Sequence, residues 1–175
     1  MNKQFLSFLF IFLVAICVSA QTDKARNIDE FGRLPCGDFL ARMDNIFIES
    51  QNSPDSKIYV VYYGGRYRKK NIWNKKTKEL NVKLEYPHPE DGLNYAKSIP
   101  LYLTSELKAL TRTYKLSKDK FILVNGGFRE NIEVEIWFVP KDAESPKPIP
   151  TITEKDIKFR KDKPLKIPRY STCYE

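Results

Sequence analysis

This chain contains few of the residues that enzymes and metalloproteins use most. Its 175 residues include a single histidine, His88, and three cysteines. A Pro-His-Pro turn is a poor place for the oriented base of a catalytic triad, so we interpret His88 as a turn residue. One histidine and so few cysteines leave no transition-metal site with a normal number of ligands. We therefore predict no catalytic residue, no metal and no cofactor, and a protein that is not an enzyme.

Nucleotide-binding loops are also missing from the sequence. Its two Gly-Gly pairs, Gly64-Gly65 and Gly126-Gly127, lack the Lys-Ser/Thr of a P-loop and the spacing of a dinucleotide fingerprint. One catalytic alternative stays open. Glu133 and Glu135 alternate along a predicted strand, about 6.5–7 Å apart, and paired carboxylates can serve glycoside hydrolysis. A small hydrolase that uses these two glutamates is therefore the alternative to a non-enzymatic protein.

The first twenty residues have the pattern of a secretory signal peptide. Lys3 gives a positive start, residues 5–15 are almost wholly apolar, and Val18-Ser19-Ala20 fits a cleavage site. The apolar run is short for a bilayer span. Bulky Ile16 does not fit a lipoprotein site at Cys17. We expect cleavage after Ala20, a secreted or periplasmic location, and no transmembrane anchor afterwards.

Two cysteines, Cys36 and Cys173, remain after that cleavage. An even pair in an exported protein is typical of a disulfide. This disulfide would close a loop of 138 residues and join the two ends of the mature chain. On the chain-entropy model such a bridge contributes up to about 4–5 kcal/mol. We therefore predict that Cys173 ties the C-terminal tail to the start of the domain.

Hydrophobic periodicity predicts alternating helices and strands within residues 38–140, after an N-terminal arm at 21–37. Apolar residues at helical spacing predict one helix from Asp38 and another from near Ser98. The second helix carries a stripe of Ile99, Leu103, Leu107 and Leu110. Runs of β-branched and aromatic residues predict strands at 57–63, 120–124 and 132–139. The last strand should bury one face, made of Ile132, Val134, Ile136 and Phe138. We expect Gly64-Gly65 to end the strand at 57–63.

The connections between these elements predict how the strands pair. A helix separates the strands at 57–63 and 120–124, so these two strands should cross over and pair in parallel. A short glycine turn joins the last two strands, which predicts an antiparallel hairpin. Residues 66–94 are interpreted as a surface insertion, with a hairpin as one form it could take.

These pairings predict an α/β (α+β) fold, a two-layer sandwich of a mixed sheet with helices on one face. After the last strand, the closely spaced Pro146, Pro148 and Pro150 predict an extended, stiff connector. Residues 141–175 are therefore expected to form an extended proline-rich C-terminal tail that Cys173 ties back over the domain.

Four features of residues 38–140 resemble one known family. They are the helix–strand unit that ends at Gly64, the long helix after Asn94, the pair Gly126-Gly127, and the strand at 133–136. This order of elements resembles the OmpA-like peptidoglycan-binding domain. The resemblance implies an α/β architecture and a cell-envelope location.

The ligand-binding residues of that family are not matched here. Family members carry an Asp shortly after the first glycine and an Arg in the following helix, which together grip diaminopimelate. In this chain the first glycine is followed by Gly65-Arg66-Tyr67, without an Asp. The helix reads Ile99-Pro100-Leu101-Tyr102-Leu103, without an Arg. The resemblance therefore implies an architecture, and it does not carry the family's contacts across.

Aromatic and basic residues are interleaved after the first strand. Sugars and bases stack on aromatic rings, while Arg and Lys hold anionic groups. The carboxyl ends of parallel strands share one edge of a sheet, so Arg129 is expected to neighbour Arg66 and Arg68. The alternative is that the rings belong to the sheet and the charges only keep a loop soluble. The candidate binding residues are Tyr63, Arg66, Tyr67, Arg68, Trp73 and Arg129.

The mature chain has 29 basic and 22 acidic residues, a net charge of +7. This charge favours anionic partners, although solubility alone would also account for it. We expect an exported, non-enzymatic binding or structural domain of the cell envelope or extracellular space. Its partner would be an anionic glycan, peptidoglycan or another envelope protein, and nucleic acid is disfavoured. A protein–protein interaction module that acts through the proline-rich tail is a further alternative.

Overall fold

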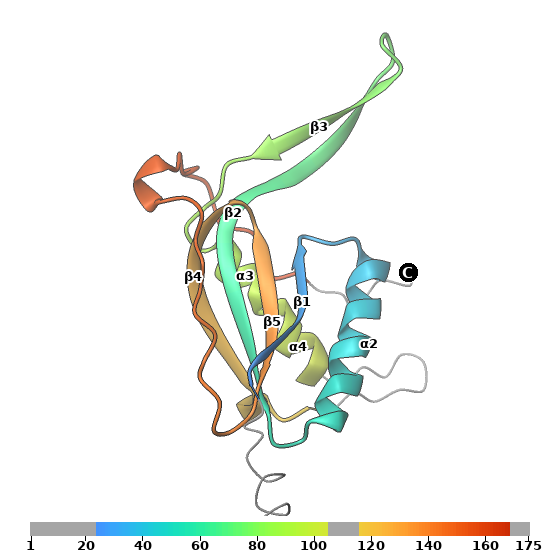
Figure 1. Ribbon diagram of the computed structural model, residues 1–175. Helices are drawn as coiled ribbons and strands as arrows, with labels where there is room; N and C mark the ends of the chain where they lie inside the picture. Colours follow the sequence, from blue (N-terminus) through green and yellow to red (C-terminus); the bar gives the residue numbers. More distant parts are fainter. Residues whose placement is uncertain (1–23, 105–115, 169–175) are drawn as a thin grey trace, which may run out of the picture.

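A mixed sheet with helices packed against it forms the body of the computed structural model, which describes residues 24–104 and 116–168 (Figure 1). The strands are β1 (Arg26–Gly32), β2 (Lys57–Asn74), β3 (Glu79–Glu85), β4 (Phe121–Asn131) and β5 (Glu133–Val139). The α-helices in these residues are α2 (Cys36–Asn52), α3 (Asp91–Ala96) and α4 (Ser98–Thr104). The predicted mixed α+β class is confirmed. The predicted signal peptide, Leu107, Leu110 and Cys173 lie outside the described residues.

Strand β2 is the centre of the sheet. Its first half pairs with β5 in antiparallel fashion and with β4 in parallel fashion, through the same residues 58–62. Because one stretch of strand has only two edges, β4 and β5 must lie on opposite sides of β2. Strand β1 then adds to the outer edge of β5, antiparallel to it. The predicted parallel pairing of the strands at 57–63 and 120–124 is confirmed.

The predicted hairpin between the last two strands is wrong, because the chain crosses over β2 between β4 and β5. The backbone N–H of Ile132 donates to the carbonyl oxygen of Arg66 at 2.9 Å. A Cβ atom built on Gly65 would lie 2.1 Å from the carbonyl carbon of Asn131. Gly65 therefore leaves the space through which the crossing passes. The expectation that Gly-Gly ends the first strand is also wrong, since β2 continues to Asn74.

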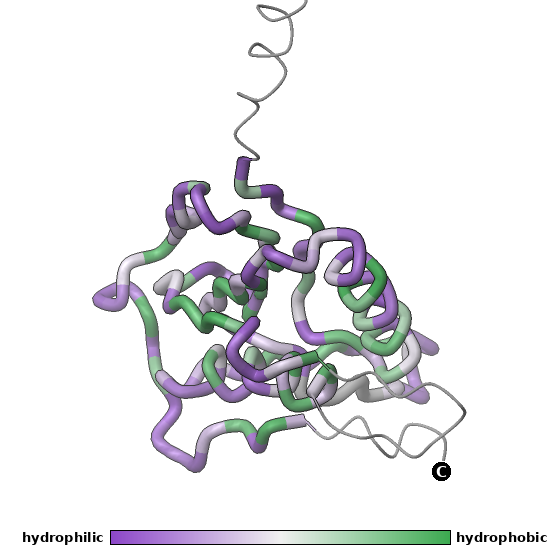
Figure 2. Tube along the Cα trace, turned by 90° about the horizontal axis from the view of Figure 1, so that it is seen from below, coloured by the Kyte–Doolittle hydropathy of each residue, from purple (hydrophilic) through white to green (hydrophobic). Residues whose placement is uncertain are grey.

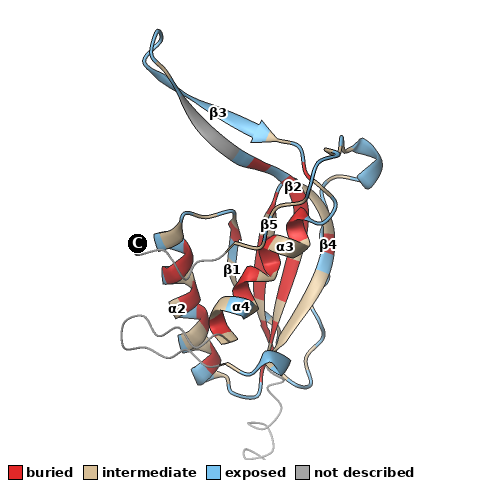
Figure 3. Cartoon of the chain, turned by 180° about the vertical axis from the view of Figure 1, so that it is seen from behind, coloured by how far each residue is buried: buried red, intermediate tan, exposed pale blue. Residues whose placement is uncertain are grey.

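The core lies between the helices and one face of the sheet. Ile99 and Leu103 of α4 are fully buried, as the predicted apolar stripe requires. The predicted alternation of the last strand is confirmed, because its four inward residues are all buried: Ile132, Val134, Ile136 and Phe138. Figure 3 shows this buried centre, in which α3, α4 and the middle of the sheet contrast with the exposed β3. Seen from below, hydrophobic and hydrophilic stretches alternate along the chain (Figure 2).

Two segments differ from the expected organisation. Residues 26–32, expected to belong to a loose arm, form β1 and bury Phe31 against the core. Residues 91–96, placed partly in the surface insertion, form α3 and bury Tyr95 and Ala96. The rest of that insertion, from Arg66 to Glu85, is the outer half of β2 paired with β3.

The described part of the tail runs back along the domain. The N–H groups of Thr151 and Ile152 both donate to the carbonyl of Phe128 in β4. Farther on, the N–H of Arg160 donates to the carbonyl of Pro87, just before α3. No helix among the described residues is long and apolar enough to span a bilayer.

Candidate functional site

The structure divides the six candidate binding residues into two groups. One group is enclosed by the sheet: Tyr63, Tyr67 and Arg129. The other group is exposed on the outer half of β2: Arg66, Arg68 and Trp73. The two groups therefore do not form the single site that the sequence predicts.

Arg129 is held by carboxylates. Its Nη1 donates to Glu30 Oε1 at 2.7 Å and to Glu133 Oε2 at 2.9 Å, and its Nη2 donates to Glu135 Oε1. The guanidinium carbon also lies 3.7 Å from the centre of the Tyr63 ring. Only 13% of the side chain is exposed. The guanidinium of Arg129 therefore already has carboxylate partners within the protein, which argues against its predicted role in ligand binding.

Arg66 does not join this group. Its Nε donates to the carbonyl of Glu130 at 3.4 Å, and its Nη2 lies 3.9 Å from Glu130 Oε2. The expected closeness of Arg66 and Arg68 to Arg129 stays a prediction, but the guanidinium groups of Arg66 and Arg129 bind different carboxylates. Consecutive side chains on a strand point to opposite faces, so Arg129 and Glu130 take different partners.

Glu135 is the most enclosed carboxylate of the network around Arg129. It accepts hydrogen bonds from the Tyr63 hydroxyl at 3.1 Å and from Trp137 Nε1 at 2.9 Å, besides that from Arg129. Glu133 and Glu135 thus share one guanidinium. This arrangement fits two carboxylates that hold a guanidinium on a sheet face, and it offers no support for an acid–base pair.

Burial and charge act together on the pKa values of this network. Burial lowers the pKa of Arg129, but its hydrogen bonds to Glu133 and Glu135 outweigh that effect and raise the pKa above the usual value. Burial raises the pKa of Tyr63 above its ordinary value of 10.0, and the charge of Glu135 acts in the same direction. Tyr63 therefore stays neutral at physiological pH and keeps its donor for Glu135.

The proline-rich segment covers the same face. The N–H of Ile149 donates to the Tyr63 hydroxyl at 3.2 Å, and Arg129 Nε donates to the carbonyl of Ile149 at 3.3 Å. Nearby, Ser145 Oγ donates to the Tyr59 hydroxyl at 3.2 Å. The segment is thus fixed to the sheet by Tyr59 and by two of the candidate binding residues, Tyr63 and Arg129.

A second buried ion pair, which sequence reasoning missed, attaches the later part of the tail. Asp91 is fully buried at the start of α3. Its carboxylate accepts bonds from Arg160 Nη2 at 2.8 and 2.9 Å, from the His88 N–H at 2.8 Å and from the Leu165 N–H at 2.7 Å. The only signal in the sequence was Asp91-Gly92, which reads equally well as a turn. His88 lies in this turn, as predicted.

The exposed group belongs to a long two-stranded ribbon, residues 66–86, which we call the β2–β3 ribbon. Its strands pair from Tyr67↔Glu85 to Asn74↔Glu79, and the pair extends away from the body of the protein (Figure 1). The ribbon contains eight basic and two acidic residues, a net charge of +6. It therefore carries most of the +8 of the whole chain.

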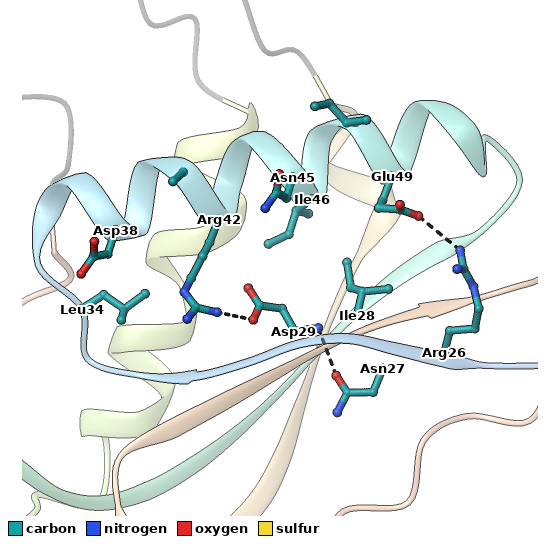
Figure 4. A pocket seen from close by; sticks show the side chains of 12 residues that line it. Arg26, Asn27, Ile28, Asp29, Leu34, Asp38, Arg42, Asn45, Ile46 and Glu49 are labelled. Atoms are coloured by element: carbon teal, nitrogen blue, oxygen red, sulfur yellow. Dashed lines mark hydrogen bonds and ion pairs between the residues drawn. The ribbon is translucent and has the colours of Figure 1, made fainter.

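The largest cavity that we describe lies elsewhere, between β1 and α2 (Figure 4). It has a volume of about 710 Å³ and is crossed by two ion pairs, Arg42–Asp29 and Arg26–Glu49. Its charged side chains are of both signs, and none of the six candidate residues lines it. We assign no ligand to this groove.

The remaining candidates concern metals and the disulfide. No group of His, Cys, Asp and Glu side chains within the described ranges could hold a metal ion. Cys36 takes part in a disulfide. Its predicted partner Cys173 lies outside the described residues, so that pairing stays a prediction.

Comparison with known protein families, with curated proteins and with solved structures finds no match to this chain.

Proposed function

We propose that this chain is an exported, non-enzymatic binding protein that attaches to an anionic surface of the cell envelope or extracellular space. The contact surface is the β2–β3 ribbon. The observation that carries this proposal is the concentration of charge, since the 21 residues of the ribbon, most of which extend from the body, hold a net +6. Such a field attracts anionic surfaces, in a way that salt weakens.

Two further observations favour binding through the ribbon over the two alternative functions. Glu133 and Glu135, the residues that a hydrolase would use, are both bound to Arg129. The other alternative, a partner bound by the proline-rich tail, is less favoured because Ile149 and Ile152 are bonded to the domain. The ribbon is the more accessible surface.

The location and architecture are parts of the same proposal. An export signal at residues 1–20 and a Cys36–Cys173 disulfide fit an oxidising compartment. The architecture is a two-layer sandwich, with helices on one face of the sheet and the proline-rich segment on the other. The order of elements expected from the sequence, on which the resemblance to the OmpA-like domain rests, recurs in α2, β2, α4, β4 and β5 once β1, β3 and α3 are set aside. Peptidoglycan and acidic polysaccharide are therefore the first surfaces to test.

The test is retention of the mature, oxidised protein on purified peptidoglycan and on an acidic polysaccharide, at low and at physiological salt. Replacing Lys75, Lys76 and Lys78 with Gln should abolish retention, because all three side chains are exposed on the ribbon. The matched control replaces exposed tail lysines, Lys141, Lys147 and Lys155, with Gln. Equal losses in both variants, or no retention of the natural protein on any anionic surface, would contradict the proposal.

A further inference from the structure

The ribbon has a second property besides its charge, which is an exposed apolar face. Five large hydrophobic side chains on it are between 44% and 57% exposed: Trp73, Leu80, Val82, Leu84 and Tyr86. Single exposed hydrophobic residues are normal on protein surfaces, but a contiguous group of this kind marks a contact surface.

The strand register gathers four of these side chains on one side. Leu80, Val82 and Leu84 alternate along β3, so they share a face. Trp73 stands directly opposite Leu80, and opposed residues of an antiparallel pair share a face as well. On the other side, Lys83 Nζ pairs with Glu85 Oε1 at 3.4 Å. Arg68 stands opposite Leu84 and so adds a cation to the face of Leu84. The ribbon is thus amphipathic, with these four apolar side chains gathered on one face.

The kinds of side chain on this face discriminate between occupants. Saccharides stack on aromatic rings, but they gain little from the aliphatic Leu80, Val82 and Leu84. A second copy of the ribbon would cover the apolar face, but it would bring two charges of +6 together. A small ligand needs a concave site, and no ribbon residue lines either of the two cavities described in this structure.

A lipid bilayer with anionic headgroups satisfies both properties at once. Aliphatic side chains enter the boundary between headgroups and acyl chains, Trp and Tyr prefer that depth, and Lys and Arg reach the phosphates. Each basic residue near an anionic membrane adds attraction, and the effects of several add up.

We propose that the β2–β3 ribbon docks on an anionic lipid membrane, with the face of Trp73, Leu80, Val82 and Leu84 in the interfacial layer. This inference rests on the proposed function, because it names the chemistry of the anionic surface that the ribbon binds. The protein then lies on the membrane without spanning it.

The experiment measures partition of the mature protein into vesicles of phosphatidylglycerol and phosphatidylcholine, against vesicles of phosphatidylcholine alone. We expect binding to the anionic vesicles only. The tryptophan emission should shift to the blue and be quenched by brominated lipid, and Trp73→Phe should remove both effects. The double variant Leu80→Ser/Leu84→Ser should lower partition about tenfold or more, because it removes apolar surface from the interface. Replacing Lys75, Lys76 and Lys78 with Gln should lower it by about 100-fold.

The matched control is Leu101→Ser, since Leu101 is 54% exposed and Leu80 is 53% exposed, but Leu101 lies on α4 away from the ribbon. The Leu101→Ser protein should bind vesicles like the natural one. The Leu80→Ser/Leu84→Ser protein should keep its salt-sensitive retention on acidic polysaccharide, which shows that the ribbon is intact.

The possible failures are distinct. Retention on polysaccharide without any partition into vesicles would overturn the lipid inference and leave the proposed function standing. No binding to either surface would overturn both. Partition that is unchanged by the leucine substitutions, or a dimer in sedimentation that those substitutions dissociate, would also overturn the lipid inference.

Discussion

Aromatic and basic residues occur together in two regions of this protein, and the two regions use them in opposite ways. In the sheet, Arg129 and Tyr63 are enclosed by Glu30, Glu133 and Glu135 and covered by the proline-rich segment. On the β2–β3 ribbon, Trp73 and the lysines of the turn are exposed to solvent. The same residue types thus stabilise the fold in one place and form an accessible surface in the other.

This difference shows that residue type alone does not identify a binding site. An enclosed cation that already has carboxylate partners contributes to stability, and removing it leaves buried charge behind. An exposed cation contributes little to stability and stays available to a partner. Substitutions in the sheet should therefore change the free energy of unfolding, and substitutions on the ribbon should change binding.

The crossing of the chain over β2 gives the largest expected effect in the sheet region. Gly65→Ala would place a Cβ atom 2.1 Å from the carbonyl carbon of Asn131, where backbone and not a flexible side chain would have to move. We expect a loss of more than about 4 kcal/mol in the free energy of unfolding, measured by urea denaturation. Gly37→Ala is the control, because a Cβ atom there would meet nothing within 4 Å apart from its chain neighbours and its own helix backbone. A Gly65→Ala protein as stable as the natural one would contradict the close passage of the chain over β2 at Gly65.

Removal of Arg129 should have the next largest effect. Arg129→Met leaves Glu133 and Glu135 without their cation, at a cost of about 3–5 kcal/mol in the free energy of unfolding. In the double variant with Glu135→Gln, part of this loss should be recovered, because one buried charge is removed with its partner. Arg66→Met, which breaks an exposed pair between the base of the ribbon and Glu130 of β4, should cost less than about 1 kcal/mol. Equal losses of unfolding free energy in Arg129→Met and Arg66→Met would contradict the difference between the two regions.

Local patterns were sufficient to predict much of the fold. The alternation at Ile132, Val134, Ile136 and Phe138 and the spacing of Ile99 and Leu103 depend only on which face is buried, so periodicity revealed them. Strand β1 was missed because its polar residues have distant partners: Asp29 pairs with Arg42, and Glu30 pairs with Arg129. The crossing at Gly65 was missed because no local signal tells on which edge of β2 the last strand lies.

The candidate site could be predicted only in part for the same reason. Interleaved aromatic and basic residues pointed to Arg66, Arg68 and Trp73, which the structure places on the exposed ribbon. Arg129 and Tyr63 carry the same signal, but Glu30 lies 99 residues from Arg129, and Glu135 lies 72 residues from Tyr63. Enclosure by partners so distant in the chain is a property of the fold, and spacing does not reveal it.

A smaller effect is expected from the Tyr63 hydroxyl. Tyr63→Phe removes its bonds to Glu135 and Ile149, and we expect a loss of about 1–2 kcal/mol at neutral pH. Because burial raises the pKa of Tyr63 above 10.0, the natural protein should also lose stability as the pH rises from 10.0 towards that raised pKa. Below pH 10.0 this contribution is fully present. The Tyr63→Phe protein should therefore lose less stability in the alkaline range, which denaturation at several pH values measures.

The smallest effect on stability is expected on the ribbon. Replacing Lys75, Lys76 and Lys78 with Gln should change the free energy of unfolding by no more than about 0.5 kcal/mol, even though we expect the same variant to lose binding to anionic surfaces. These side chains are exposed beside other cations, so their removal relieves repulsion rather than breaking a buried pair. Urea denaturation of this variant and of the tail variant at Lys141, Lys147 and Lys155 checks the point. A loss above about 1 kcal/mol in the ribbon variant alone would mean that its charges stabilise the fold, as Arg129 does, and the distinction between the two regions would fail.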